Sequence, residues 1–189
     1  MIILIVAESS TGKTQMAQNL LEIYKVPYFS IDHLKMGIYK TDRNCGFEPT
    51  SDNEIIEGKL WPIIKAMITT CIDNGQNLIV EGCYVSPGRL AEFGAEYSKE
   101  IIPVFMGFTE NYVRNHFLSD IIPYRSVIER RPYPEGRTAE EIIHNNAALR
   151  QRCAEEGVCF FDIDEDYEKD TAKIYRWIAQ RAEQMKFTQ

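Results

Sequence analysis

The 189 residues match one ordinary domain in length, and with 44% hydrophobic and 26% charged residues the composition is that of a globular protein. A disordered chain, a collagen-like fibre and a small disulfide-stapled domain are therefore excluded. The 28 acidic and 21 basic side chains give a net charge of −7, which disfavours broad binding to nucleic acid or to an anionic membrane. Any anion that the protein binds must be held by a local cluster of donors.

The cysteines and the N-terminal segment indicate a cytoplasmic protein. The five cysteines are odd in number, widely scattered and without a C-x-x-C pair, so we expect reduced thiols. The apolar opening 1–7 is too short to span a bilayer and lacks the basic region that begins a secretion signal. The histidines lie far apart and predict no dedicated metal site of the H-E-x-x-H type.

Short apolar runs predict the strands of the fold. They are Ile2–Val6, Tyr28–Ile31, Asn77–Val80, Ile101–Phe108 and Val158–Ile163. These runs lack polar alternation, which is typical of parallel strands covered on both faces. Because segments with helical periodicity separate the runs, we expect right-handed β–α–β crossovers. The sequence therefore predicts a single α/β domain over residues 1–189, with a helix–sheet–helix arrangement in three layers.

The first two helices are predicted from the spacing of apolar residues. Met16, Leu20 and Tyr24 share one face of a helix that follows the first strand. A second apolar pattern runs from residue 56 to residue 71 and contains Pro62. This proline should either kink the second helix or mark its true start.

Two further helices are predicted near the C-terminus. Thr138 and Glu141 form a capping-box signature that opens one helix, and Gly157 fits its end. The apolar positions of the last helix are Tyr175, Ile178, Ala182 and Met185.

The segment Ala7–Thr14 (AESSTGKT) carries the sharpest functional signal. It follows an apolar strand and precedes an amphipathic helix, which is the context required by the P-loop or Walker A pattern G-x-x-x-x-G-K-[ST]. The backbone N–H groups that would surround a phosphate belong to Ser9, Ser10, Thr11, Gly12 and Lys13. The Lys13 ammonium can reach the β- and γ-phosphates, and the Thr14 hydroxyl can bind Mg²⁺.

Ala7 departs from this pattern, because a glycine is expected at its position. The Ala7 methyl group limits backbone freedom and requires a slight adjustment of the turn. The alternative interpretation is an ordinary strand–turn–helix unit in which the string GKT occurs by chance.

The string SSTGKT, with an Asp that ends the second strand, resembles the P-loop kinase superfamily and within it the small phosphotransferases. These include adenylate, shikimate and gluconate kinases, chloramphenicol phosphotransferase and zeta-toxin kinases. The stretches IDHLKMG and NLIVEGCY are also similar to bacterial proteins labelled adenylate kinase-like or 2-phosphoglycerate kinase-like. The resemblance covers nearly the whole chain in its helix and strand pattern. It implies a five-stranded parallel sheet, Mg-ATP as the phosphoryl donor and a mobile lid over about 117–137.

Asp32 is the first of two acidic residues at the ends of predicted strands, where open α/β sheets bind ligands. In the alcohol kinases that the sequence resembles, such an aspartate binds the acceptor hydroxyl and accepts its proton. A positioned base of this kind contributes about 10²–10⁴-fold to the rate. The alternative is that Asp32 only caps the short helix predicted over Leu34–Ile38. Both roles can coexist, because a cap uses one carboxylate oxygen.

Glu81 ends the third strand and brings a carboxylate to the same edge of the sheet. It could hold a Mg²⁺-bound water, the role that the acidic residue of the Walker B motif has in this family. The alternative is a buried acid that pairs with a structural cation. The segment VEG also resembles the aspartate-glycine element of nucleotide monophosphate kinases, in which an arginine follows soon afterwards. Here the first arginine is Arg89, which is displaced down the chain.

A local concentration of arginines after the fourth strand predicts the lid. Its members are Arg114, Arg125, Arg130, Arg131 and Arg137. In P-loop kinases such arginines close over the transferring phosphate, and we select Arg125 and Arg130 as the catalytic pair. The alternative is a solvated helix face that pairs with Asp120 and Glu129.

Two loops are assigned from the resemblance alone. The loop Asp164–Tyr167 lies where the family frames adenine, and an acidic turn that caps the last helix explains it equally well. The loop Lys40–Asn53 lies where the family recognises the acceptor.

The sequence thus favours an ATP-dependent, Mg²⁺-dependent phosphotransferase that acts on a hydroxyl or phosphate of a small molecule. A nucleotide-binding regulatory module without transfer to a small acceptor and a nucleotide or polynucleotide kinase are the alternatives. A GTPase switch is disfavoured because no N-K-x-D guanine signature occurs. The acceptor, the preference for ATP over GTP and the oligomeric state stay open.

Overall fold

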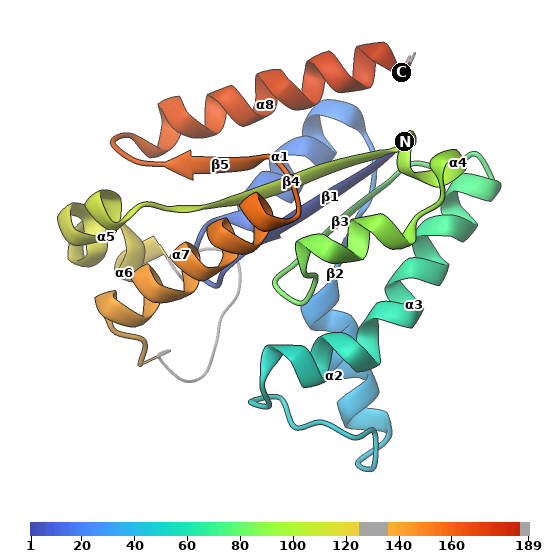
Figure 1. The fold of residues 1–189 in the computed structure, drawn as a ribbon, viewed down its shortest axis with the longest axis horizontal. Helices are drawn as coiled ribbons and strands as arrows, with labels where there is room; N and C mark the ends of the chain where they lie inside the picture. The colour runs from blue at the N-terminus through green and yellow to red at the C-terminus, as the bar shows by residue number, and fades with distance from the viewer. Residues whose placement is uncertain (125–135, 186–189) are drawn as a thin grey trace.

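A parallel sheet forms the centre of the molecule (Figure 1). The computed structural model describes residues 1–124 and 136–185, and its five strands lie in the order β2-β3-β1-β4-β5. The strands are β1 (Ile2–Ala7), β2 (Tyr28–Ser30), β3 (Leu78–Gly82), β4 (Ile101–Phe108) and β5 (Phe160–Ile163). Each neighbouring pair runs parallel. The predicted α/β fold and its five-stranded parallel sheet are confirmed.

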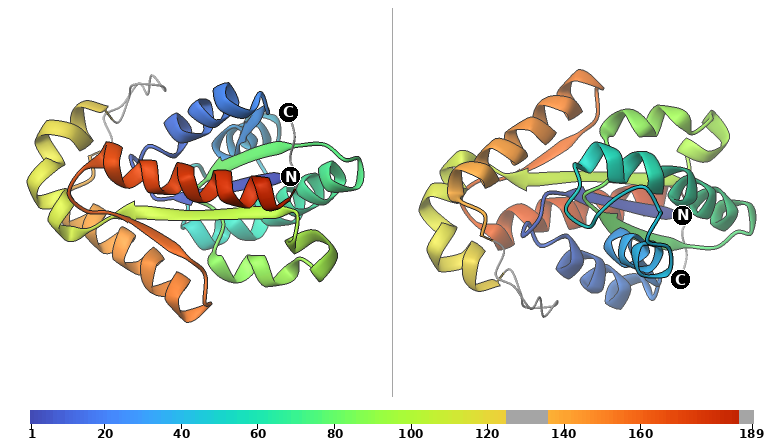
Figure 2. Two further views of the ribbon diagram at one scale, coloured as in Figure 1. Left: turned by 90° about the horizontal axis from the view of Figure 1, so that it is seen from above. Right: turned by 90° about the horizontal axis from the view of Figure 1, so that it is seen from below.

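Helices cover both faces of this sheet (Figure 2). On one face lie α1 (Lys13–Tyr24) and α8 (Tyr167–Gln184), and on the other lie α3 (Asn53–Asp73) and α7 (Ala139–Glu155). The shorter helices are α2 (Ile31–Thr41), α4 (Ala95–Ser98), α5 (Glu110–His116) and α6 (Ile122–Tyr124), with a 3₁₀-helix η1 (Pro87–Glu92) and a π-helix η2 (Phe117–Ile121). The three predicted layers are therefore present.

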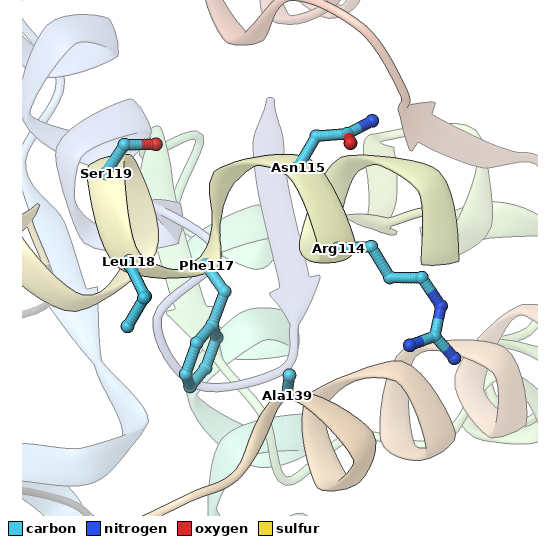
Figure 3. Close-up of a pocket in the computed structure, with 6 residues that line it drawn as sticks. All are labelled: Arg114, Asn115, Phe117, Leu118, Ser119 and Ala139. Atoms are coloured by element: carbon cyan, nitrogen blue, oxygen red, sulfur yellow. The ribbon is translucent and has the colours of Figure 1, made fainter.

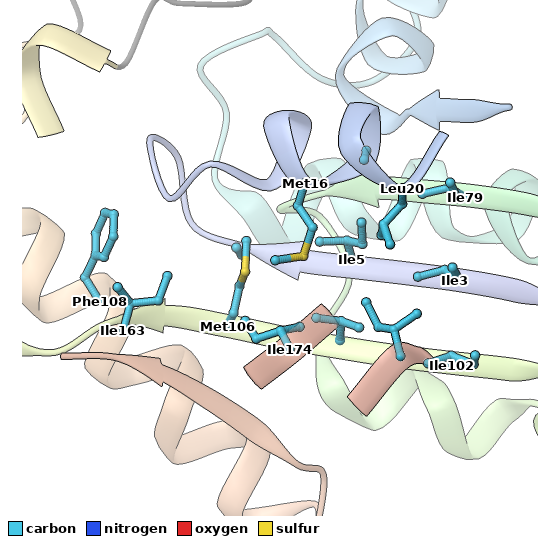
Figure 4. Packing of buried hydrophobic residues seen from close by; sticks show 14 of the residues in the cluster. Ile3, Ile5, Met16, Leu20, Ile79, Ile102, Met106, Phe108, Ile163 and Ile174 are labelled. Carbon is cyan, nitrogen blue, oxygen red and sulfur yellow. The ribbon is translucent and has the colours of Figure 1, made fainter. Parts of the chain in front are cut away.

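The central strand β1 is buried on both faces because its alternate side chains enter two hydrophobic clusters. Ile3 belongs to the cluster that contains Met16 of α1 and Ile174 of α8 (Figure 4). Leu4 belongs to the cluster that contains Leu60 of α3. This two-sided burial explains why the strand sequences show no polar alternation.

Helix α3 runs through Pro62, so of the two predicted alternatives, a kink or the start of the helix, the second is wrong. A proline inside a helix removes one hydrogen bond and costs about 3 kcal/mol. The first two turns nevertheless stay helical because Ile56 and Leu60 are fully buried in the core. Burial of each such side chain contributes about 1.5–3 kcal/mol, which offsets the cost of the proline.

The ends of the C-terminal helices follow local capping rules. Thr138 and Glu141 form both hydrogen bonds of the predicted capping box at the start of α7. Gly157 has a φ of +66° just after this helix, as a glycine at a helix end should. Helix α8 begins well before Tyr175, because the Asp166 side chain accepts a hydrogen bond from the Lys169 N–H and caps the helix.

Two boundaries near the sheet edge differ from the prediction and change the setting of the acidic residues. Strand β2 ends at Ser30, and α2 begins at Ile31, so Asp32 lies in the first helical turn. Strand β3 extends to Gly82, so Glu81 is a strand residue. Within residues 1–124 and 136–185, the helices all fall short of the combined length and apolar character that a bilayer crossing demands.

Candidate functional site

The turn between β1 and α1 has the backbone geometry of an anion-binding nest. Ser10 and Gly12 adopt left-handed conformations, with φ of +66° and +86°. The buried Thr11 fixes the turn, since its Oγ1 donates to the Glu8 carbonyl at 2.7 Å. Alternating backbone conformations of this kind direct successive N–H groups into one concavity. Lys13 then opens α1, and the first N–H groups of a helix have no acceptor within the helix.

Ala7 fits this turn without strain. It is the last residue of β1, pairs with Met106 of β4 and has an ordinary negative φ. The left-handed conformations fall at Ser10 and Gly12 instead. The departure from the glycine of the sequence pattern is therefore accommodated in the strand.

Tyr167, the first residue of α8, lies directly against this turn. Its hydroxyl donates to the Thr11 carbonyl at 3.4 Å. An ideal Cβ on Gly12 would lie 1.9 Å from the Tyr167 hydroxyl oxygen. Gly12 is thus required both by its positive φ and by the close approach of this ring. Burial raises the pKa of the Tyr167 hydroxyl far above its usual value, so the hydroxyl stays protonated and able to donate.

Asp166, in the acidic loop before Tyr167, caps α8, as one of the two interpretations expected. The first turn of α8 in turn holds the loop. Asp170 Oδ2 accepts hydrogen bonds from the backbone N–H of Asp164 at 2.9 Å and of Glu165 at 3.4 Å. The Asp164 side chain in turn accepts from the Thr109 hydroxyl at 2.6 Å. A role of the loop in framing adenine stays a prediction.

A group of charged side chains meets around Cys83, which follows β3. Burial raises the pKa of the Cys83 thiol to about 11. Lys13 and Lys35 act against this shift, whereas Asp32 and Glu8 add to it. Glu8 and Lys13 follow β1, and Asp32 and Lys35 follow β2. The carboxyl ends of these parallel strands lie at the same edge of the sheet. The structure therefore brings together two of the predicted site residues, Lys13 and Asp32.

Asp32 forms an ion pair within α2. The Lys35 Nζ lies 3.0 Å from Asp32 Oδ1 and donates a hydrogen bond to the Tyr84 hydroxyl at 2.5 Å. Asp32 is not the N-cap of α2, because Ser30 takes that position. Sequence analysis missed Lys35 and Tyr84; the spacing of three residues between Asp32 and Lys35 on a helix was the available signal.

Glu81 is buried near the end of β3. In register it pairs with Ile5 of β1 and with Ser30 of β2. Ile5 belongs to the cluster beneath α1, and residues in register on parallel strands point to the same face. Glu81 therefore faces the layer of α1, the helix that carries Lys13 and Thr14.

Thr14 and Glu81 supply the donor chemistry that Mg²⁺ prefers, a hydroxyl and a carboxylate. In the described residues no three side chains of the His, Cys, Asp or Glu type gather as a ready-made metal cage. Mg²⁺ commonly binds one or two protein groups and completes its shell with waters and substrate phosphates, so a Mg²⁺ site at Thr14 and Glu81 stays a prediction.

Arg89 is committed to structural contacts. It donates to Glu57 at 2.9 Å and to Glu92 at 2.7 Å, and these bonds raise the pKa of its guanidinium. The largely buried Glu57 also accepts from the N–H and the hydroxyl of Ser86. The contacts tie the segment around η1 to α3.

Only the two ends of the predicted lid, residues 117–124 and 136–137, lie within the described residues. Arg125, Arg130 and Arg131 lie outside the described residues. Arg114 lies on an exposed face, where it pairs with Glu110 at 2.8 Å. This partner differs from Asp120 and Glu129, which the solvated-face alternative named, and Asp120 pairs with His116 instead. Arg137 instead reaches the turn between β1 and α1, because its Nη1 lies 4.0 Å from Glu8 Oε2.

A pocket of about 430 Å³ lies between α5, η2 and the start of α7 (Figure 3). Its lining residues are Arg114, Asn115, Phe117, Leu118, Ser119 and Ala139. Three of the lining residues belong to the π-helix η2, a distortion that is common near functional sites. The rings of Phe108, Tyr112 and His116 stack in sequence from the end of β4 along α5, with ring centroids 4.7 and 4.4 Å apart.

Comparison with known proteins supports the fold. Shikimate kinase from Aquifex aeolicus vf5 has a TM-score of 0.54 and 13% identity, covering 96% of this chain and 98% of that chain. A sugar kinase from Janibacter sp. HTCC2649 has a TM-score of 0.53 and 13% identity, covering 94% of each chain. No protein-family model and no curated protein matches the chain. The chain thus has the fold of the P-loop small-molecule kinases.

Proposed function

We propose that the protein is an ATP-dependent phosphotransferase that moves a γ-phosphoryl group to a hydroxyl or phosphate of a small molecule. The observation that carries this proposal is the juxtaposition of Lys13, at the end of a nest-like turn, and Asp32 at the same edge of the sheet. A donor phosphate and an acceptor group need such adjacent binding groups, because phosphoryl transfer depends mainly on positioning and charge stabilisation.

In this proposal the phosphate-binding turn holds the donor. The N–H groups from Ser9 to Lys13 bind the phosphate oxygens, and the Lys13 ammonium offsets the charge on the β- and γ-phosphates. Thr14 and Glu81 would hold Mg²⁺, which supplies further neutralisation of the phosphate charge when it is bound. Lys13 has the burial that this role requires, since its side chain is almost inaccessible to solvent.

Asp32 would act on the acceptor. Its carboxylate accepts a hydrogen bond from the acceptor hydroxyl and takes the proton as the new oxygen–phosphorus bond forms. The bond between the γ-phosphorus and the β–γ bridging oxygen breaks, and ADP leaves with that oxygen. Arg125 and Arg130 would contribute guanidinium groups that stabilise the charge on the transferring group.

The test is ADP release from Mg-ATP over a panel of hydroxyl compounds and phosphomonoesters, measured above a baseline without acceptor. Lys13→Met should abolish Mg-ATP binding in calorimetry, whereas Asp32→Asn should keep that binding and lower kcat by about 10²–10⁴-fold. Lys25→Met is the control, since Lys25 lies on the surface and pairs with the exposed Glu22 at the end of α1. Absence of Mg-ATP binding by the folded wild-type protein would overturn the proposal, and so would full activity of Asp32→Asn.

A further inference from the structure

The ion pair between Asp32 and Lys35 is unusual for its burial. The two side chains are 19% and 9% exposed, and their charged atoms lie 3.0 Å apart. Another ion pair with the same spacing of three residues, Glu22 and Lys25, has side chains that are 74% and 73% exposed. The exposed pair is of the kind that contributes little, whereas a buried ammonium has lost its water and must be compensated by the protein.

Tyr84 also stabilises the buried positive charge of Lys35. Its hydroxyl oxygen accepts a hydrogen bond from the Lys35 Nζ at 2.5 Å, and the Nζ lies 4.7 Å from the centre of the Tyr84 ring. Tyr84 follows β3, and Lys35 lies one turn into α2. The ammonium is therefore fixed from two elements, by a carboxylate on its own helix and by a phenol from the neighbouring segment.

This arrangement gives the fold little net stability compared with an apolar packing. Buried ion pairs are weak stabilisers, and hydrophobic side chains of similar volume often serve the fold equally well or better. Leu34 and Ile38, on the same helix, pack against the adjacent hydrophobic cluster, so apolar side chains are accommodated beside this position. The ion pair is better explained by what it does to Asp32.

We propose that Lys35 is a positioning residue for Asp32, held in place by Tyr84; this inference rests on the proposed phosphotransferase function. The Lys35 ammonium fixes Asp32 Oδ1 and thereby sets the plane of the carboxylate, which determines where Oδ2 points. It also favours the ionised carboxylate, the form that can accept a hydrogen bond from an acceptor hydroxyl.

In this role Lys35 helps to align the acceptor through Asp32 and takes no part in binding the donor nucleotide. Misplacement of a reacting group by about 1 Å costs about 10²-fold in rate. A lysine that served only to join α2 to the segment after β3 would affect stability and leave the ionisation of Asp32 and the kcat of the folded enzyme unchanged. The two explanations therefore differ in their kinetic consequences.

The test compares Lys35→Met, Lys35→Arg and Tyr84→Phe with the matched control Lys25→Met in the full chain. Lys35→Met should lower kcat by about 10²-fold while the Kd for Mg-ATP stays within about twofold. Lys35→Arg should restore most of the activity because it keeps the cation, and Tyr84→Phe should give an intermediate loss. Lys25→Met should match the wild type. If Lys35→Met keeps its fold and retains the wild-type kcat, the inference is overturned.

The acidic limb of the pH profile of kcat/KM distinguishes the two explanations, because a purely structural role of Lys35 would leave the position of this limb unchanged. Loss of the cation should shift this limb to higher pH in Lys35→Met and leave it in place in Lys35→Arg. Lys13 and Glu8 in the turn act electrostatically on the Cys83 thiol together with Asp32 and Lys35, and the Tyr84 phenol contacts Lys35 directly. These groups are unchanged in both variants, so an unshifted limb in Lys35→Met would contradict the inference.

Failure of the proposed function can be told apart from failure of the inference. If the wild type transfers phosphate to no acceptor, the function falls, and carbon-13 NMR of the Asp32 carboxyl still measures its coupling to Lys35. The Asp32 pKa should then rise in Lys35→Met and stay unchanged in Lys25→Met. If the pKa does not move in Lys35→Met, Lys35 does not govern the ionisation of Asp32. If Lys35→Met does not fold, Lys35→Arg and Tyr84→Phe decide through kcat: wild-type values in Tyr84→Phe would overturn the role of Tyr84.

Discussion

Replacing Gly12 with alanine should destabilise the protein through two separate effects at the phosphate-binding turn. The residue has a φ of +86°, and its new Cβ would lie 1.9 Å from the Tyr167 hydroxyl oxygen and 2.9 Å from the ring carbon that bears it. The left-handed backbone costs an alanine about 1–2 kcal/mol, and overpacking against the ring costs about 1–3 kcal/mol. We expect the free energy of unfolding to fall by about 2–5 kcal/mol in urea titrations.

A double-mutant cycle with Tyr167→Leu separates these two effects. Removal of the ring relieves the overpacking and leaves the backbone strain, so Gly12→Ala should cost about 1–3 kcal/mol less in that background. Gly58→Ala in α3 is the matched control, because its Cβ would meet nothing within 4 Å, and it should stabilise the helix by about 0.5–1 kcal/mol. Equal urea midpoints for Gly12→Ala and wild type would refute the reasoning, and a zero coupling would refute the contact with Tyr167.

Three further predictions test the local chemistry. Thr138→Ala removes the capping box of α7 and should lower the free energy of unfolding by about 1 kcal/mol in urea titrations; an unchanged midpoint would show that the cap contributes nothing. Hydrogen bonds led by that from Arg89 lower the pKa of Glu92 from 4.5 to about 2, so the stability that Glu92 contributes is present above pH 4.5 and is lost as the pH falls towards 2. Thermal unfolding of Glu92→Gln should show a weaker dependence on acid pH than the wild type, and parallel curves would contradict this. The Cys83 thiol, with a pKa near 11, should react with iodoacetamide at pH 8 far more slowly than the exposed Cys159, and mass spectrometry that finds equal rates would sink the prediction.

The fold could be predicted because its signals are local. The apolar run of β1 is long enough to be buried on both faces, and the capping pair Thr138 and Glu141 lies within one helical turn. Pro62 shows the limit of local rules, because the burial of Ile56 and Leu60 in the shared core outweighs the preference of proline for a helix start. That outcome depends on residues of other elements, which no local pattern contains.

The candidate site was predictable only in part for the same reason. The P-loop pattern from Ser9 to Thr14 can be found from the sequence alone, because the turn and the helix that follows it are contiguous in the chain. The contact between Tyr167 and Thr11 joins residues 156 positions apart, and the contact between Lys35 and Tyr84 joins residues 49 positions apart. Contacts between residues so far apart in the sequence depend on the order of the strands in the folded sheet, which local sequence patterns do not specify.

The charge balance at the turn explains how an acidic chain can offer an anion site. Glu8 places a buried carboxylate inside the turn, and this charge alone would oppose the binding of a phosphate beside Lys13. Arg137, which directly precedes the capping residue of α7, lies 4.0 Å from that carboxylate and offsets it. In the proposed function, the turn would thus draw its positive charge from two distant parts of the sequence, Lys13 and Arg137. Because Arg137 lies at the end of the lid that the sequence predicts, we propose that this segment affects the affinity of the turn for anions through Glu8.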